Sequence, residues 1–362
     1  MRKLSRGEIR AVVVSGALVA GLVSAGTAVG YADEQPVNEA FTAAAGEFDV
    51  PHDLVVAVGY GETHLDGHDG QPSQDNGFGV MHLVSNPKRH TLEQASTLTG
   101  ESVTDLKKDT VANIRGGAAV LRAIADDSGL DATARDRLGA WYPVVARYSG
   151  ASDERVAAMY ADTVFEFLTD GVRASAQGEQ VAVAGQPVRP ERGTYADVQA
   201  LDEGVGTRDY PDSIWNPASD ANYASGRSQD IRAVVIHVTQ GSYAGTISWF
   251  QNPDAQVSAH YVVRSEDGEI THMVNDADTA WHARDGNAYS IGIEHEGFVD
   301  DPSWFTDAMY RSSAALTKWL CDTYGIPKNR ESIVGHSEVP GNDHTDPGPN
   351  WDWDLYMSYV NA

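Results

Sequence analysis

The order of apolar and polar positions divides the chain into a helical first part and a mixed second part. Apolar residues recur at helical spacing in the first part, most clearly over 113–125 (NIRGGAAVLRAIA). In the second part, 231–239 (IRAVVIHVT) is typical of a strand buried on both faces, and 304–324 of an amphipathic helix ended by Gly325. The pattern predicts a mainly α domain followed by an α/β domain with helices flanking a central mixed sheet.

The stretch between the two parts has neither a helical nor a strand period. Residues 171–203 are rich in Gln, Gly, Ala and Pro, a composition typical of a flexible connector. The chain has 362 residues, which exceeds the usual size of one domain. We therefore expect a helical domain at 37–170, a linker at 171–203 and a second domain at 204–362.

The first 32 residues have the pattern of a secretory signal peptide. Basic residues precede an apolar run at 11–29, and Gly30-Tyr31-Ala32 forms a small-x-small cleavage site. A retained membrane anchor is the alternative, because the run approaches the length of a bilayer span. The many Gly, Ser and Ala residues lower its hydrophobicity and favour cleavage. We expect a secreted protein without stable membrane insertion once residues 1–32 are removed.

Charge and cysteine content limit the partners and the sources of stability. The chain has 52 acidic and 26 basic residues, a formal net charge of -26. This argues against a nucleic-acid partner, since phosphate binding needs basic patches. The single cysteine, Cys321, allows no intramolecular disulfide, so stability must come from core packing.

Candidate metal ligands lie in two distant segments. His237 is near the end of the run 231–239, and His336 precedes Asp346 by ten residues within 335–353 (GHSEVPGNDHTDPGPNWDW). Two neutral imidazoles and one carboxylate suit a catalytic Zn²⁺ whose fourth position is open for water. Such a metal lowers the pKa of bound water towards neutrality and polarises a carbonyl. These residue types outline a hydrolytic site, although only the fold can bring them together.

Four segments of the second part resemble, in order, the zinc-dependent N-acetylmuramoyl-L-alanine amidases of the type 2 family, relatives of the peptidoglycan recognition proteins. The segments are 234–239 (VVIHVT), 257–270 (VSAHYVVRSEDGEI), 280–297 (AWHARDGNAYSIGIEHEG) and 335–353. The resemblance implies that His237, His336 and Asp346 hold Zn²⁺. It also implies a secreted, cell-wall-associated hydrolase that cuts peptidoglycan between N-acetylmuramic acid and L-alanine.

The same resemblance implies further roles. Glu294 matches the family's acid/base residue, which takes a proton from water and passes it to the leaving amine; Glu296, on the same face of the strand, is expected to be structural. Trp281 and His282 match a wall of the substrate cleft. Relatives often have lysine at the position of His344, and a histidine there stabilises an oxyanion when protonated or as a neutral N–H donor.

The first part resembles the lysozyme-like domains of soluble lytic transglycosylases. The segments that carry the likeness are Gly61-Glu62-Thr63, 77–83 (GFGVMHL) and 113–117 (NIRGG). Glu62 would be the single acid that protonates the leaving glycosidic oxygen. Two departures weaken the match, because His82 replaces the usual glutamine and the asparagine expected beside Tyr148 is missing. We therefore expect Glu62 to be a solvated glutamate at a helix end, in a domain that only grips glycan.

Three functions remain open from the sequence. The chain is an amidase, a bifunctional amidase and lytic transglycosylase, or a peptidoglycan-binding protein without hydrolysis. Binding proteins of this kind often lack a zinc ligand. His237, His336 and Asp346 are all present, which favours the enzyme.

Overall fold

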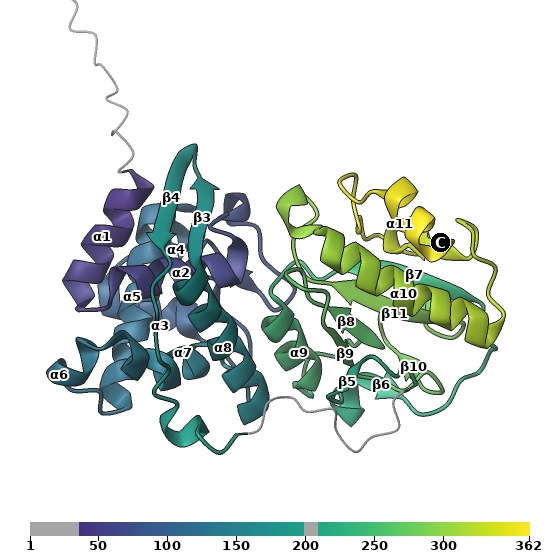
Figure 1. The fold of residues 1–362 in the computed structure, drawn as a ribbon, viewed down its shortest axis with the longest axis horizontal. Helices are drawn as coiled ribbons and strands as arrows, with labels where there is room; N and C mark the ends of the chain where they lie inside the picture. The colour runs from purple at the N-terminus through teal and green to yellow at the C-terminus, as the bar shows by residue number, and fades with distance from the viewer. Residues whose placement is uncertain (1–35, 199–208) are drawn as a thin grey trace, which may run out of the picture. The chain divides into compact units, whose positions relative to one another are not determined.

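The computed structural model describes residues 36–198 and 209–362, so the signal peptide expected at 1–32 lies outside the described residues. The described residues belong to one unit. The first part is helical and the second contains the main sheet, which confirms the predicted fold classes (Figure 1). Within the described ranges, no helix combines the length and apolar character needed to cross a membrane.

Helices build the first part around one apolar core. They are α1 (Val37–Phe48), α2 (His52–Thr63), α3 (Thr91–Thr99), α4 (Val103–Lys108), α5 (Thr110–Asp127), α6 (Ala132–Arg135), α7 (Tyr142–Tyr148) and α8 (Glu154–Asp170). Five consecutive residues of α2, Leu54 to Val58, are fully buried. A helix that is apolar on every side must be surrounded, and α1, α5 and α8 pack around α2.

The GFGVMHL segment forms a tight turn between the short strands β1 (Gly77–Phe78) and β2 (Leu83–Val84). The side chain of Asn113 on α5 donates to the carbonyl of Phe78 at 2.9 Å and accepts from the amide of Met81 at 2.8 Å. Gly79 has φ of +67°, and a Cβ there would collide with Asn113. The motif therefore locks the turn onto α5.

The structure corrects the prediction for part of the linker. Residues 171–184 form an antiparallel hairpin of β3 (Gly171–Ala176) and β4 (Glu179–Ala184), joined by a two-residue turn with positive φ at both positions (Figure 1). Val172, Val181 and Val183 are buried in the core of the helical part. An unstructured connector is therefore wrong for 171–184. The alternation of apolar and polar residues over 171–184 is weak, because alanines occupy several of the positions beside the buried valines. The division into domains stays a prediction.

A six-stranded mixed sheet organises the second part. Its strands, in spatial order, are β12 (Ile333–Gly335), β7 (Ala233–Val238), β11 (Ser290–His295), β8 (Tyr261–Val263), β9 (Ile270–His272) and β5 (Ile214–Trp215). The first four run parallel, and β9 pairs antiparallel with β8. Two further strands, β6 (Tyr223–Ala224) and β10 (Thr279–Ala280), pair separately.

Helices cover both faces of this sheet. The long helix α10 (Asp307–Tyr324) lies along one face, where Met309, Leu316 and Leu320 share a core with alternate residues of β7, β8 and β11 (Figure 1). The helix α11 (Trp353–Val360) completes that core through Tyr356. On the other face, α9 (Tyr243–Gln251) packs beside β8. The result is the flanked mixed sheet that the periodicity predicts.

The parallel strands β12, β7 and β11 place chemically active residues at one edge of the sheet. Glu294 on β11 is in register with His237 on β7, and Gly335 at the end of β12 is in register with Ile236. His336 follows directly. In open α/β sheets, ligands bind outside the carboxyl ends of the strands.

Candidate metal centre

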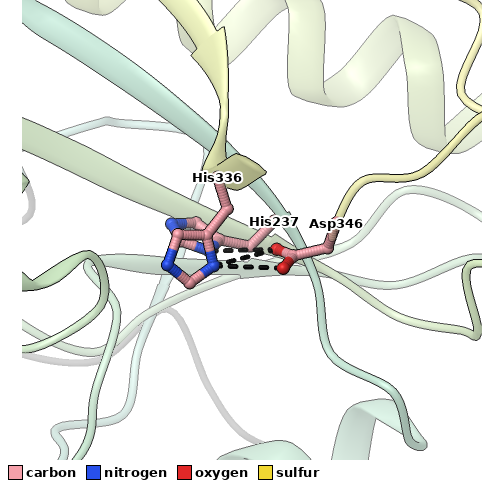
Figure 2. A group of neighbouring side chains, drawn as sticks. All are labelled: His237, His336 and Asp346. Atoms are coloured by element: carbon pink, nitrogen blue, oxygen red, sulfur yellow. Dashed lines mark hydrogen bonds and ion pairs between the residues drawn. The ribbon is translucent and has the colours of Figure 1, made fainter. Parts of the chain in front are cut away.

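The side chains of His237, His336 and Asp346 point toward one another at this edge (Figure 2). Nδ1 of His237 lies 3.3 Å from Oδ2 of Asp346, and Nδ1 of His336 lies 3.1 Å from Oδ1. All three side chains are buried. The structure thus brings His237 to two residues, His336 and Asp346, that lie about a hundred positions later in the sequence.

Local geometry after β12 returns Asp346 to the two histidines. The backbone N–H of Ser337 donates to the carbonyl of Asp346 at 2.9 Å, which closes the intervening loop. Gly335 permits a close approach, since a Cβ there would lie 2.7 Å from Cδ of Pro347. The glycine and proline of the GHSEV and TDPGP segments therefore act together to place the carboxylate.

The charges of the cluster suit a divalent cation. Burial, and then the neighbouring His336, lower the pKa of His237 to about 4, so its imidazole is neutral at pH 7. Burial opposes ionisation of Asp346, but hydrogen bonds from His237 and His336 outweigh it and hold the pKa of that carboxyl below its usual value. Neutral imidazoles and an ionised carboxylate are the forms that ligate Zn²⁺.

The spacing of the donor atoms also fits one tetrahedral ion. Zinc–nitrogen and zinc–oxygen bonds of roughly 2 Å in a tetrahedron put neighbouring donors about 3.3 Å apart. The nitrogen-to-oxygen distances of 3.1 and 3.3 Å match this edge length. Nε2 of His336 is buried and has no hydrogen-bond partner among the described residues. The three residues therefore fit the metal that the sequence predicts.

His282 contacts the candidate ligand His237. Its Nδ1 lies 2.9 Å from Nε2 of His237, the nitrogen that faces away from Asp346. A Cβ at Gly292 would lie 2.5 Å from the His282 ring, so only glycine leaves room for it. Metal-binding histidines usually engage a second group through their other nitrogen, which fixes the orientation of the ring.

Glu294 is a buried carboxyl beside this cluster. Its side chain is 5% exposed, and Oε2 has no hydrogen-bond partner among the described residues. Burial, and then the negative charge of Asp346, raise the pKa of Glu294 well above its ordinary value. Glu296 differs, because it accepts the backbone amides of Tyr243 and Ser265, each at 2.8 Å. Glu294 thus keeps a carboxylate oxygen without a partner among the described residues, whereas Glu296 holds two segments together.

His344 lies at the open side of the cluster. Its ring stacks on His336 with centroids 4.4 Å apart, and its side chain is 56% exposed. Burial, and then His336, lower the pKa of His344. Trp281 is partly buried and lines the same cleft. All the residues that the sequence predicts for the amidase site therefore lie around one cleft of about 530 Å³; their individual roles stay predictions.

Glu62 is not solvated, which corrects the expectation for this residue. It is 2% exposed, at the end of α2. Tyr160 donates to its Oε1 at 2.7 Å, and Ser242 of the second part donates to Oε2 at 3.4 Å. Nδ1 of His82 forms an ion pair with Oε2 at 3.2 Å. Both carboxylate oxygens therefore have protein partners. The apolar periodicity of the sequence does not predict these contacts.

A second group of possible ligands, Asp209, His272 and Asp276, lies elsewhere in the second part. Tyr261 and Tyr324 donate to the two carboxylate oxygens of Asp276, each at 2.9 Å. Nε2 of His272 lies 2.9 Å from the carbonyl of Val274. These contacts occupy both carboxylate oxygens of Asp276 and Nε2 of His272, while Nδ1 of His272 has no partner among the described residues. Because the carboxylate of Asp276 is already engaged within the protein, we assign no metal to this group.

Comparisons with known proteins cover the residues of the metal centre. A family model described as N-acetylmuramoyl-L-alanine amidase (Amidase_2) matches residues 227–349. The chain is 42% identical over 171 residues to N-acetylmuramoyl-L-alanine amidase A of Achromobacter lyticus, a match covering 42% of this chain and 96% of that protein. It is 40% identical over 114 residues to 1,6-anhydro-N-acetylmuramyl-L-alanine amidase AmpD of Haemophilus influenzae, covering 29% of this chain and 59% of that protein.

Solved structures align with the chain as well. The crystal structure of a selenomethionine derivative of AmpD aligns with a TM-score of 0.35 and 28% sequence identity. That alignment covers 45% of this chain and 99% of the other.

Proposed function

Because this chain belongs to the Amidase_2 family of N-acetylmuramoyl-L-alanine amidases, we propose that it hydrolyses the amide bond between N-acetylmuramic acid and L-alanine in peptidoglycan. The observation that carries the proposal is the buried convergence of His237, His336 and Asp346, with Glu294 in register beside them. A site of this kind suits amide hydrolysis, which needs an activated water and a group that returns a proton to the leaving nitrogen.

His237, His336 and Asp346 would hold Zn²⁺. When bound, the ion supplies a Lewis acid and a water of lowered pKa. The chain's own contribution is to keep the imidazole of His237 neutral and the carboxylate of Asp346 charged, and to fix the ring of His237 through His282.

Glu294 is the proton shuttle in this proposal. It takes a proton from the attacking water and gives it to the amide nitrogen as the carbon–nitrogen bond breaks. Its burial raises its affinity for a proton, which favours the first of these transfers, the uptake of a proton from water. His344 contributes an N–H donor at the open side of the cleft, where negative charge develops on the carbonyl oxygen.

The proposed setting is the cell wall. The pattern of residues 1–32 supports secretion, and the chemistry above supports peptidoglycan as the partner. We assign no glycan cleavage to Glu62. A general acid must reach the glycosidic oxygen. Glu62 is buried, and both its carboxylate oxygens are engaged by Tyr160, His82 and Ser242.

The test combines metal content with product analysis. Chelation of the full chain should abolish release of stem peptides from purified peptidoglycan, and Zn²⁺ should restore it; mass spectrometry of the products identifies the bond. His336→Ala should lose both zinc and activity, whereas Glu294→Gln should keep zinc and lose activity. His90→Ala, which changes an exposed histidine of the helical part, is the control. Full activity of His336→Ala without bound zinc would end the proposal.

A further inference from the structure

The helical part supplies some of the wall of the metal-centre cleft. Pro72, Ser73 and Gln74 line the same cleft as His237 and Glu294. They belong to the loop that precedes β1, far in sequence from the family segment at 227–349. A cleft built from both parts of the chain can bind substrate groups that the family segment alone does not reach.

The loop is attached to the strand that carries the first candidate ligand. The backbone N–H of Gln74 donates to the carbonyl of Gln240 at 3.2 Å. Gln240 lies three residues after His237, just beyond the end of β7. This bond fixes the loop next to the metal ligands without involving the side chain of Gln74.

A buried ionic network holds the other side of the loop. Nε2 of His82 lies 2.7 Å from Oγ of Ser73 and 3.1 Å from Oδ1 of Asp75, while its Nδ1 faces Glu62. Burial opposes the charge of this imidazole, but Asp75 and Glu62 outweigh it and raise the pKa of His82 to about 10. Gly77 leaves space for the ring, since a Cβ there would collide with it. These contacts hold the loop at residues 72–74 in place as part of the cleft wall.

One side chain on this wall has free hydrogen-bonding capacity. Three glutamines line the cleft. Oε1 of Gln240 accepts the amide of Val299 at 2.8 Å, and Nε2 of Gln256 donates to a carbonyl at 3.3 Å. The side chain of Gln74 is exposed, and its amide has no such partner within residues 36–198 and 209–362. An amide offers two donors and one acceptor oxygen, all uncharged.

We propose that Gln74 is a specificity residue of the amidase cleft and that its amide hydrogen-bonds the glycan part of the substrate. Sugar hydroxyl and acetamido groups are uncharged donors and acceptors that match a carboxamide. The carboxylates of a stem peptide would instead call for cations. Its backbone amides also match a carboxamide, so contact with the peptide is the outcome that the measurement below must exclude. The inference rests on the proposed function, because it takes the substrate to be a muropeptide.

Binding can be tested separately from cleavage. The full chain carrying Glu294→Gln and loaded with Zn²⁺ serves as the background, and calorimetry measures its Kd for a disaccharide peptide and for the same stem peptide without sugar. Adding Gln74→Ala should raise the Kd for the disaccharide peptide about three- to tenfold, the effect of losing one net hydrogen bond. The Kd for the sugar-free peptide should change less.

The control is Gln71→Ala in the same background, since Gln71 is also exposed in this loop but does not line the cleft. It should leave both Kd values unchanged. An unchanged Kd with Gln74→Ala, or an equal rise for both ligands, would overturn the inference. Cleavage by the wild-type protein is measured in parallel. If binding depends on Gln74 while wild type cuts no amide bond, the proposed reaction fails and the contact with glycan stands.

Discussion

Replacing His82 by glutamine should remove the cation that joins the buried carboxylates of Glu62 and Asp75. Burial alone would lower the pKa of His82, but the two carboxylates raise it from 6.5 to about 10. That difference corresponds to about 5 kcal/mol of stabilisation when the histidine is charged in both the folded and the unfolded chain. Removing one partner of a buried ion pair costs about 3–5 kcal/mol, which is the same scale.

The pH dependence distinguishes this network from ordinary packing. Because the folded-state pKa is raised, the stabilisation is complete below pH 6.5 and is lost as the pH rises through about 10. Each pH unit inside that window removes about 1.4 kcal/mol, so wild type should lose about 3 kcal/mol of unfolding free energy between pH 7 and pH 9. The His82→Gln protein should start lower and lose far less over this interval.

The assay is urea unfolding followed by tryptophan fluorescence at pH 6.5, 7, 8 and 9, which the eight tryptophans make practical. His90→Gln is the matched control, because His90 is exposed and makes only a distant ion pair with Glu93 at 3.9 Å. The free energy of unfolding of this control should change with pH as that of wild type does. If the wild-type and His82→Gln stabilities fall in parallel with pH, His82 is not a buried cation and the reasoning is refuted.

Three further predictions concern single residues. Glu62→Gln should leave glycan chain length in a peptidoglycan digest unchanged; anhydromuramic products that vanish with this mutation would show that Glu62 is catalytic. His344→Ala should reduce kcat by about 10²-fold, the scale for losing one oxyanion donor. The lowered pKa of His344 leaves it neutral above pH 7, so His344→Lys should move the alkaline limb of the pH–rate profile upward; overlaying profiles would exclude His344. Gly292→Ala should displace His282 and weaken zinc affinity about 10–100-fold, measured by competition with a chelating dye; unchanged affinity would show that His282 does not support the ligand.

Much of the fold could be predicted from local patterns. The helical period of 113–125 and the mainly apolar, β-branched run of 231–239 each indicate an element that the structure contains, because burial selects apolar residues at the spacing of the element. The sequence pattern does not predict the hairpin at 171–184. Its strands are short, and their apolar positions are recognisable only against the helical core that they cover.

The sequence by itself also determined which residues could hold a metal, since ligand chemistry is a property of residue type and the GHSEV and TDPGP segments are local. Only the tertiary structure decided that His237 reaches them, through the parallel pairing of β7 with β12.

Only the tertiary structure decided the state of Glu62 and the place of Gln74. Glu62 is an exposed helix-end carboxylate by local pattern, yet His82, Tyr160 and Ser242 enclose it from three separate segments. By local pattern Gln74 is an ordinary loop residue. The fold places it beside Gln240, just beyond the end of β7. Burial and charge pairing depend on distances between residues remote in the chain, and those distances follow from packing and strand register, which local periodicity does not specify.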